Sequence, residues 1–116
     1  MNETPTPIHL EDGDALDRFL ETHDVALIEL YTSGCGKCQA MEPVLGNVAR
    51  ETGVPIGLVN PGDDLALLER FALESVPTLC CFEDGTEVGR IADGFLSTAA
   101  VVAFLESNLP DAVDSS

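Results

Sequence analysis

The sequence predicts an α/β fold, with a mixed central sheet of four to five strands flanked by about four helices. Up to residue 74, apolar segments of strand length alternate with segments whose apolar residues recur at helical spacing, a pattern typical of a parallel sheet with helical connections. Beyond that point "EDGT", residues 83–86, separates two strand-like segments and predicts an antiparallel hairpin. We expect residues 1–116 to form one domain, with an ordered core over about 8–109.

The same patterns define each element in turn. The segment 25–31 is largely apolar on both faces, which predicts a central strand. Pro43 is expected to kink the helix that contains it, because proline removes one backbone hydrogen bond. The polar first seven and last seven residues are expected to fray. In chain order we expect strand 8–11, helix 12–23, strand 25–31, helix 35–52, strand 55–60, helix 63–74 with Leu65, Leu68, Phe71 and Ala72 inward, strand 78–82, strand 87–92, and a helix capped by Ser97 that ends near Leu109.

The charge of the chain limits its partners. Twenty-one acidic and five basic residues give a formal net charge of -16, which disfavours binding to nucleic acid or anionic membranes. The longest apolar run, 99–105, is far shorter than the ~20 residues of a membrane span, and the N-terminus has no signal-peptide pattern. We therefore expect a soluble, cytoplasmic monomer. The scattered acids indicate either a protein from a salt-accumulating organism or an acidic mesophilic protein.

Two cysteines begin the helix predicted over 35–52. A helix N-terminus carries partial positive charge, so it stabilises a thiolate, the species that attacks disulfides. Cys35 lies nearest the end of the helix and is expected to be the exposed nucleophile, while Cys38, one turn on, would be the resolving thiol. Gly36 permits close approach of the backbone. Zinc sites also use paired cysteines at this spacing, so the pair alone is a weak signal.

The wider pattern resembles the thioredoxin family over residues 8–109. The resemblance rests on the element order, "CGKC" at 35–38, Pro43 within the following helix, "VPT" at 76–78 and "DG" at 84–85. It implies a thioredoxin fold and a protein-disulfide reductase that acts as an electron carrier. Its redox-active group would be a Cys35–Cys38 disulfide, with no bound cofactor or metal. Its partners would be disulfide-bearing client proteins and a separate NAD(P)H- and flavin-dependent reductase.

The resemblance also implies roles for residues outside the cysteine pair. Val76, Pro77 (with a cis peptide bond) and Gly94 would bind client segments. Glu29 shares a mainly apolar strand face, where burial of a carboxylate is costly and raises its pKa. The resemblance implies that Glu29 relays protons for Cys38. The alternative is an edge-facing glutamate in water.

Several positions depart from the family pattern. The chain contains no tryptophan, and Gly34 and Tyr31 stand where most thioredoxins carry one, which predicts a smaller docking surface. The lysine that often accompanies the buried acid is replaced, by our alignment at Gly57. Lys37, the chain's only lysine, replaces a proline, and its charge is expected to stabilise the Cys35 thiolate. Alternatively Lys37 is a solvated lysine without such a role.

Two further cysteines, Cys80 and Cys81, are adjacent in a strand and should point to opposite faces. They cannot both converge with Cys35 and Cys38 on one zinc ion. We expect two buried apolar side chains, with a regulatory thiol as the alternative, and we assign no metal role to His9 or His23. Alternatives for the whole chain are a non-catalytic binding module, a metal or iron–sulfur carrier, and a glutaredoxin-type enzyme, although we find no glutathione-binding pattern.

Overall fold

The computed structural model describes residues 6–62 and 64–113 of the chain. It contains five strands and four helices within these residues, arranged as expected. The elements are β1 (Ile8–Leu10), α1 (Gly13–Thr22), β2 (Val25–Leu30), α2 (Gly36–Thr52), β3 (Ile56–Val59), α3 (Leu65–Phe71), β4 (Thr78–Glu83), β5 (Thr86–Ile91) and α4 (Thr98–Asn108).

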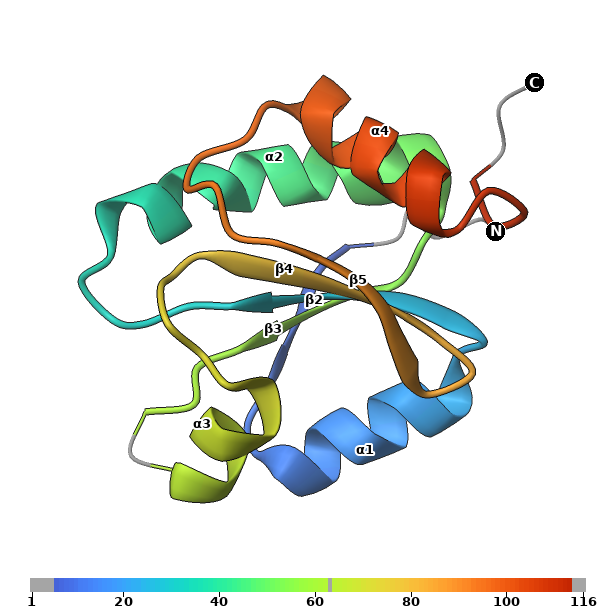
Figure 1. The fold of residues 1–116 in the computed structure, drawn as a ribbon. Helices are drawn as coiled ribbons and strands as arrows, with labels where there is room; N and C mark the ends of the chain where they lie inside the picture. The colour runs from blue at the N-terminus through green and yellow to red at the C-terminus, as the bar shows by residue number, and fades with distance from the viewer. Residues whose placement is uncertain (1–5, 63, 114–116) are drawn as a thin grey trace.

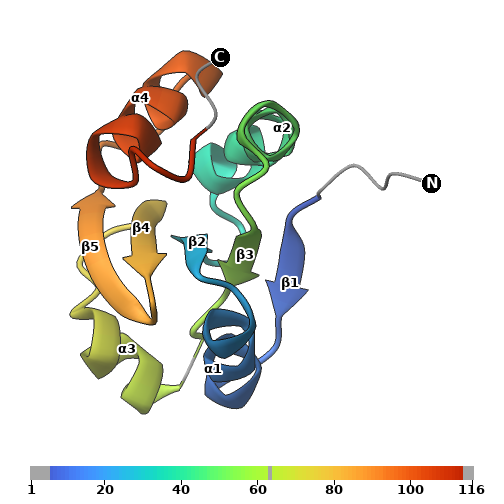
Figure 2. The same cartoon turned by 90° about the vertical axis from the view of Figure 1, so that its right-hand side faces the viewer.

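The five strands form one mixed sheet in the order β1-β3-β2-β4-β5. β1, β3 and β2 are parallel, whereas β4 is antiparallel to both β2 and β5. Helices α2 and α4 cover one face of the sheet and α1 and α3 cover the other, as Figures 1 and 2 show. The predicted mixed sheet with four flanking helices is therefore confirmed, and β2 is its central strand.

Alternation along β2 divides the core into two layers. Ala26, Ile28 and Leu30 pack on the side of α1 and α3, while Leu27 packs on the side of α2 and α4. Glu29 is two residues from Leu27 in the strand, so its side chain also points toward α2 and α4. A carboxyl group thus enters an otherwise apolar layer directly beneath the helix that begins at the cysteine pair.

Helix boundaries follow local capping. The side chain of Asp12 caps α1, Cys35 caps α2 and Ser97 caps α4, each by accepting a backbone N–H three residues further on. The hairpin turn between β4 and β5 places Asp84 and Gly85 at positive φ, as the Asp-Gly signal predicted. Except for α3, the predicted elements agree with the observed ones to within one residue at each end.

The prediction for the third helix is wrong in length and partly wrong in facing, since Phe71 is buried as predicted and Leu68 is half-buried. α3 spans only Leu65–Phe71, because Asp64 caps its start and Ala72 ends it in the left-handed conformation with φ of 48°. In this frame Leu67 and Phe71 enter the core, whereas Leu65 is 72% exposed and Ala72 is also exposed. The amphipathic pattern identified the helix correctly, but the capping residues set its ends.

The ends of the chain were expected to fray. Residues 1–5 and 114–116 lie outside the described residues. Within the last seven residues, Val113 is buried and packs on the α2/α4 layer, and its N–H donates to the carbonyl of Leu109. The packed structure therefore extends a few residues beyond the end of α4.

Candidate active site

The cysteine pair lies at the start of α2, just after the loop that connects it to the central strand β2. Cys35 is the N-cap residue of α2, and a disulfide joins it to Cys38, with the two Cα atoms 5.2 Å apart. The N–H of Cys38 donates to Cys35 Sγ over 3.1 Å. Cys35 is half-buried, whereas Cys38 is only 3% exposed. A partner can therefore reach the sulfur of Cys35, while Cys38 is available only from within the site.

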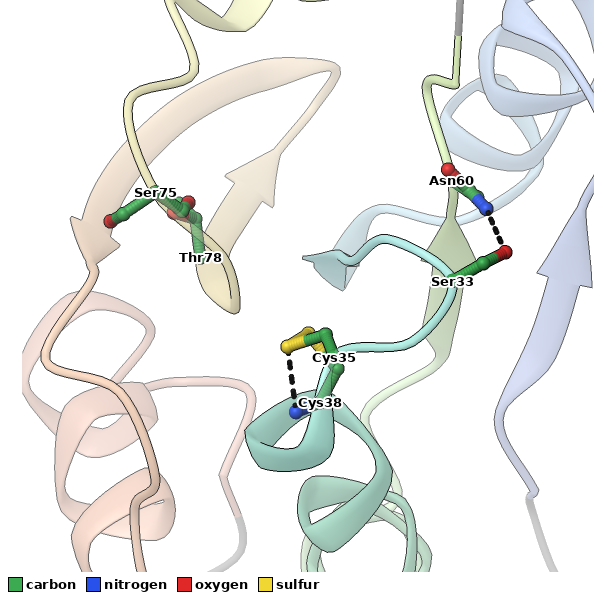
Figure 3. The surroundings of a disulfide bond; sticks show 6 residues. All are labelled: Ser33, Cys35, Cys38, Asn60, Ser75 and Thr78. Atoms are coloured by element: carbon green, nitrogen blue, oxygen red, sulfur yellow. Dashed lines mark hydrogen bonds between the residues drawn. A yellow bond between two sulfur atoms is a disulfide. The ribbon is translucent and has the colours of Figure 1, made fainter.

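Side-chain hydrogen bonds tie down loops on both sides of the disulfide, with Ser33 and Asn60 on one side and Ser75 and Thr78 on the other (Figure 3). Asn60 Nδ2 donates to Ser33 Oγ over 3.3 Å, which joins the loop before the disulfide to the end of β3. On the other side, Thr78 Oγ1 donates to the carbonyl of Ser75 over 2.7 Å. That bond spans the turn that contains the cis Val76–Pro77 peptide, the isomer that the family resemblance implied. Val76 is half-buried and Pro77 is buried.

The loop between β5 and α4 completes the rim of the site. Gly94 has a φ of +81°, and a Cβ at this position would lie 3.6 Å from Lys37 Nζ. The lysine side chain therefore lies along the backbone of Gly94. The next turn of this loop is fixed to α2, because the N–H of Leu96 donates to the sulfur of Met41 over 3.3 Å. Lys37 is exposed, so its ammonium group is available at the rim.

Gly36 has no internal contact that requires a glycine. A Cβ at this position would meet nothing within 4 Å. The close backbone approach predicted from the sequence is therefore not an approach by another part of this chain. Any such approach at Gly36 must come from outside the molecule.

Glu29 is buried beside the disulfide and lacks a positive partner. It is 1% exposed, and Oε2 has no hydrogen-bond partner among the described residues. In the strand register, Leu58 of β3 and Leu79 of β4 lie opposite Glu29. The alignment that placed the missing lysine at Gly57 is therefore corrected. Gly57 faces the other layer, toward Leu10 and Ile28, and the neutral neighbour of Glu29 is Leu58.

This environment raises the pKa of Glu29 from 4.5 to about 7, mainly because burial disfavours the charged form, with a further contribution from the charge of Glu42. Burial also raises the pKa of Tyr31, with the charges of Glu29 and Glu42 adding to the effect. The alternative of an exposed, edge-facing glutamate does not apply, because β2 is the central strand and the side chain is covered.

A pocket of about 180 Å³ connects Glu29 with the resolving cysteine and opens to the surface. Glu29, Cys38 and Leu58 contribute buried lining, and exposed residues surround the opening. The sequence reasoning missed Glu42 and His9 as members of this group. The signal for Glu42 was its spacing of four residues from Cys38, which places both on one face of α2. The full lining is His9, Glu29, Tyr31, Thr32, Ser33, Gly34, Cys38, Gln39, Glu42 and Leu58.

Comparisons with known proteins agree on one family. The thioredoxin family model matches residues 8–107. A thioredoxin from Chlamydia caviae is 40% identical over 85 residues, which are 72% of this chain and 82% of that protein. A thioredoxin from Mycobacterium bovis is 27% identical over 95% of this chain and 96% of its own. The solved structure of a mutant thioredoxin from Halobacterium salinarum superposes with a TM-score of 0.83 at 28% identity, covering 93% of this chain and 95% of that one.

The chain belongs to the thioredoxin family. Thioredoxins are protein-disulfide oxidoreductases, and the paired Cys35 and Cys38 supply the redox-active disulfide that this activity needs. The activity requires no bound cofactor. Within residues 6–62 and 64–113, no group of three or more histidine, cysteine or acidic side chains is arranged to hold a metal ion.

The remaining cysteines, Cys80 and Cys81, lie in β4, away from the redox pair in sequence. Cys80 packs in the α1/α3 layer and Cys81 in the α2/α4 layer, so the prediction of opposite faces is confirmed. Burial raises the pKa of Cys80 to about 12 and that of Cys81 to about 11. Both side chains are therefore held as thiols at neutral pH, which makes them poor nucleophiles. In the described part of the chain, no helix has the length and apolar character needed to cross a membrane.

Proposed function

We propose that this protein reduces disulfides of client proteins in two exchange steps. The Cys35 thiolate attacks a client disulfide and forms a mixed disulfide, and Cys38 then attacks Cys35 Sγ and releases the client as a thiol. The observation that carries this order is the difference in exposure within one helical turn. Cys35 is accessible at the helix N-cap and Cys38 is 3% exposed.

Glu29 acts in this scheme as the proton acceptor for Cys38. Both side chains line the same pocket, and the pKa of Glu29 is raised to about 7, close to the pH at which a base must take and release protons in the cell. Glu29→Gln should therefore slow the second step at neutral pH. An unchanged rate across the pH range would contradict this role.

Client segments bind beside Cys35, between the Val76–Pro77 turn and the loop at Gly94. The cis Val76–Pro77 turn and the closeness of Gly94 to Lys37, which lies between the two cysteines, support this assignment. Gly36 leaves open space in which a client backbone can approach. Lys37 places a positive charge in the first turn of α2, where it favours the Cys35 thiolate and so stabilises the reduced form.

The oxidised protein is reduced again by a separate NAD(P)H- and flavin-dependent reductase. The protein works in the cytoplasm as a monomer. Residues 1–116 form a single domain with its ordered core at about 8–109. The protein does not bind nucleic acid or membranes. The net charge of -16 supports the last point, since like charges repel. The same charge supports function at high salt, where cations screen the self-repulsion of the acidic surface. A melting temperature that does not rise with KCl concentration would contradict the salt adaptation.

The decisive experiment measures reduction of a generic disulfide-containing protein in high KCl, with dithiothreitol as electron source. Wild type should accelerate the reaction over dithiothreitol alone, and Cys35→Ser and Cys38→Ser should both fail to do so. If folded, reduced wild type gives no acceleration, the proposed general reductase is wrong. A binding module or a reductant dedicated to one client would then be indicated, and Cys38→Ser would trap that client as a mixed disulfide.

A further inference from the structure

The pocket behind Cys38 contains a second carboxylate, Glu42, which the mechanism above does not use. Glu42 is four residues after Cys38 in α2, so the two side chains occupy one face of the helix, one turn apart. Glu42 and Glu29 both line the pocket. The two acids therefore meet across a shared cavity, one contributed by α2 and the other by the central strand.

The two carboxyl groups differ sharply in their access to solvent. Glu42 is exposed at the mouth of the pocket, whereas Glu29 is 1% exposed and leaves Oε2 without a hydrogen-bond partner among the described residues. An ionised carboxylate is hydrated at low cost on the surface and at high cost in the interior. Ionisation of Glu29 is therefore costly, and the buried carboxyl group holds its proton beside the exposed side chain of Glu42.

None of the pocket-lining residues from β2, β3 or α2 carries a positive charge that would stabilise ionised Glu29. The groups that face Glu29 are His9 from β1, Tyr31 and the loop 32–34 after β2, Leu58 from β3, Leu79 from β4, and Cys38, Gln39 and Glu42 from α2. Of these, His9 is the one side chain that can carry positive charge, and its Nδ1 lies 3.1 Å from the hydroxyl of Tyr31, at the exposed mouth. Leu58 occupies the strand position directly beside the buried acid.

We propose that Glu42 is a positioning residue that holds the proton on Glu29 across the pocket and thereby sets the pH at which Cys38 is activated. The inference rests on the proposed role of Glu29 as the base for Cys38. In the second step, the Cys38 proton passes to a Glu29 oxygen, and the Cys38–Cys35 bond forms. The Cys35–client bond breaks at the same time, and its electron pair leaves on the client sulfur. Only ionised Glu29 can accept that proton. The charge of Glu42 therefore raises the pH at which the Cys38 step becomes fast.

This proposal predicts a gain of rate, which damage to the structure does not produce. Removing the charge with Glu42→Gln should speed the Cys38 step about threefold near pH 6, the effect of a shift of about half a pKa unit. Reversing the charge with Glu42→Lys, which would shift the pKa of Glu29 by about one unit, should speed it roughly fivefold over wild type. Above about pH 8 this gain should disappear, because Glu29 is then ionised in each protein and is a weaker base in the two variants.

The assay follows release of thionitrobenzoate after reduced protein is mixed with dithiobis-nitrobenzoate. Attack by Cys35 gives the first release, which depends on reagent concentration, and attack by Cys38 gives the second, which does not. The pH profile of the second phase is recorded at the lowest KCl concentration that keeps wild type folded, because salt screens an exposed charge. NMR titration of the side-chain carboxyl carbons gives the Glu29 midpoint directly.

Matched variants separate the possible outcomes. Glu51→Gln removes an exposed carboxylate from the far end of the same helix and should leave the profile unchanged. Glu29→Gln should lose the rise near neutral pH and keep only the alkaline rise of the thiol itself. His9→Gln should shift the midpoint in the direction opposite to Glu42→Gln. If His9→Gln instead shifts the midpoint in the same direction as Glu42→Gln and by the same amount, the effect comes from altering the pocket mouth and not from charge. That result would overturn the proposal.

The proposed function and this inference fail in different ways. If wild type shows no second release, the exchange mechanism itself is wrong. If wild type and Glu29→Gln behave as described but Glu42→Gln and Glu42→Lys follow the wild-type profile, only the role of Glu42 is wrong.

Discussion

Replacing Glu29 by glutamine should stabilise the folded protein, by an amount that grows with pH. The residue is 1% exposed, its strand neighbours are Leu58 and Leu79, and Oε2 has no hydrogen-bond partner among the described residues. Glutamine keeps the shape of the side chain and cannot ionise. Comparison of the two proteins therefore isolates the free-energy cost of the buried charge.

The size and sign of the effect follow from the pKa of Glu29, which folding raises from 4.5 to about 7. Below pH 4.5 the carboxyl group is protonated in both the folded and the unfolded protein, so its contribution to the free energy of unfolding does not vary with pH. Between these two values the unfolded chain releases the proton while the folded protein retains it, so stability falls as pH rises. Above about pH 7 the loss is complete and amounts to about 3 kcal/mol, since one pKa unit corresponds to ~1.4 kcal/mol.

Urea unfolding of the oxidised proteins, followed by far-ultraviolet circular dichroism, measures this difference. Between pH 5 and pH 8 the stability advantage of Glu29→Gln over wild type should increase by about 2.5 kcal/mol, with most of the increase complete by pH 7. Glu51→Gln, which removes an exposed carboxylate from α2, is the control and should show no such trend. An advantage that stays constant to within about 0.5 kcal/mol across this range would refute the argument that Glu29 is buried and protonated.

Other parts of the structure give three further expectations. Leu45 is fully buried, so Leu45→Ala should lower the free energy of unfolding by about 2–5 kcal/mol; a loss well below this range in urea unfolding would mean that the α2/α4 layer is loosely packed. In the reduced native protein, Cys80 and Cys81 should not react with dithiobis-nitrobenzoate within minutes, whereas all four cysteines should react in urea. Lys37→Gln should make the redox potential more negative by roughly 10–20 mV in equilibration with glutathione, and identical potentials for wild type, Lys37→Gln and Lys37→Pro would exclude tuning by Lys37.

The fold could be predicted from the sequence because its local signals agree with one another. The apolar segments alternate between strand-like and helix-like spacing. Ser97 and Asp84–Gly85 predicted a helix start and a hairpin turn, and the structure has both at these residues. The third helix shows where this reasoning fails. Its apolar residues allow more than one inward face, and packing in the α1/α3 layer selects the one that buries Leu67 and Phe71. Asp64 and the left-handed Ala72 set only the ends of the helix.

The site could be predicted only as far as single residues carry their own signal. Two cysteines at a helix start indicate thiol chemistry, and a carboxylate on an apolar strand face indicates burial. The neighbours of Glu29 could not be predicted in this way, because they depend on strand register. A shift of one position separates Gly57, which faces the α1/α3 layer, from Leu58, which lies beside the carboxyl group. Glu42 and His9 join the pocket from different elements. The spacing of Glu42 from Cys38 was a local signal, whereas His9 has none and depends on the pairing of β1 with β3.

The instability attributed to Glu29 and its strength as a base have the same physical origin. An ordinary glutamate with a pKa near 4.3 is too weak a base to take the proton of a thiol whose pKa is about 8.5. Desolvation raises the pKa of Glu29 to about 7 and brings it closer to that of the thiol, and it does so by making the ionised form unfavourable in the folded protein. Each unit by which burial raises the pKa of Glu29 therefore lowers the free energy of unfolding above neutral pH by ~1.4 kcal/mol. A variant that places a cation beside Glu29, such as Leu58→Lys, should recover part of the stability at pH 8. At that pH, where Glu29 is ionised in both proteins, the variant should also slow the Cys38 step, because its Glu29 is the weaker base. Measurement of both quantities on one protein tests whether they are linked.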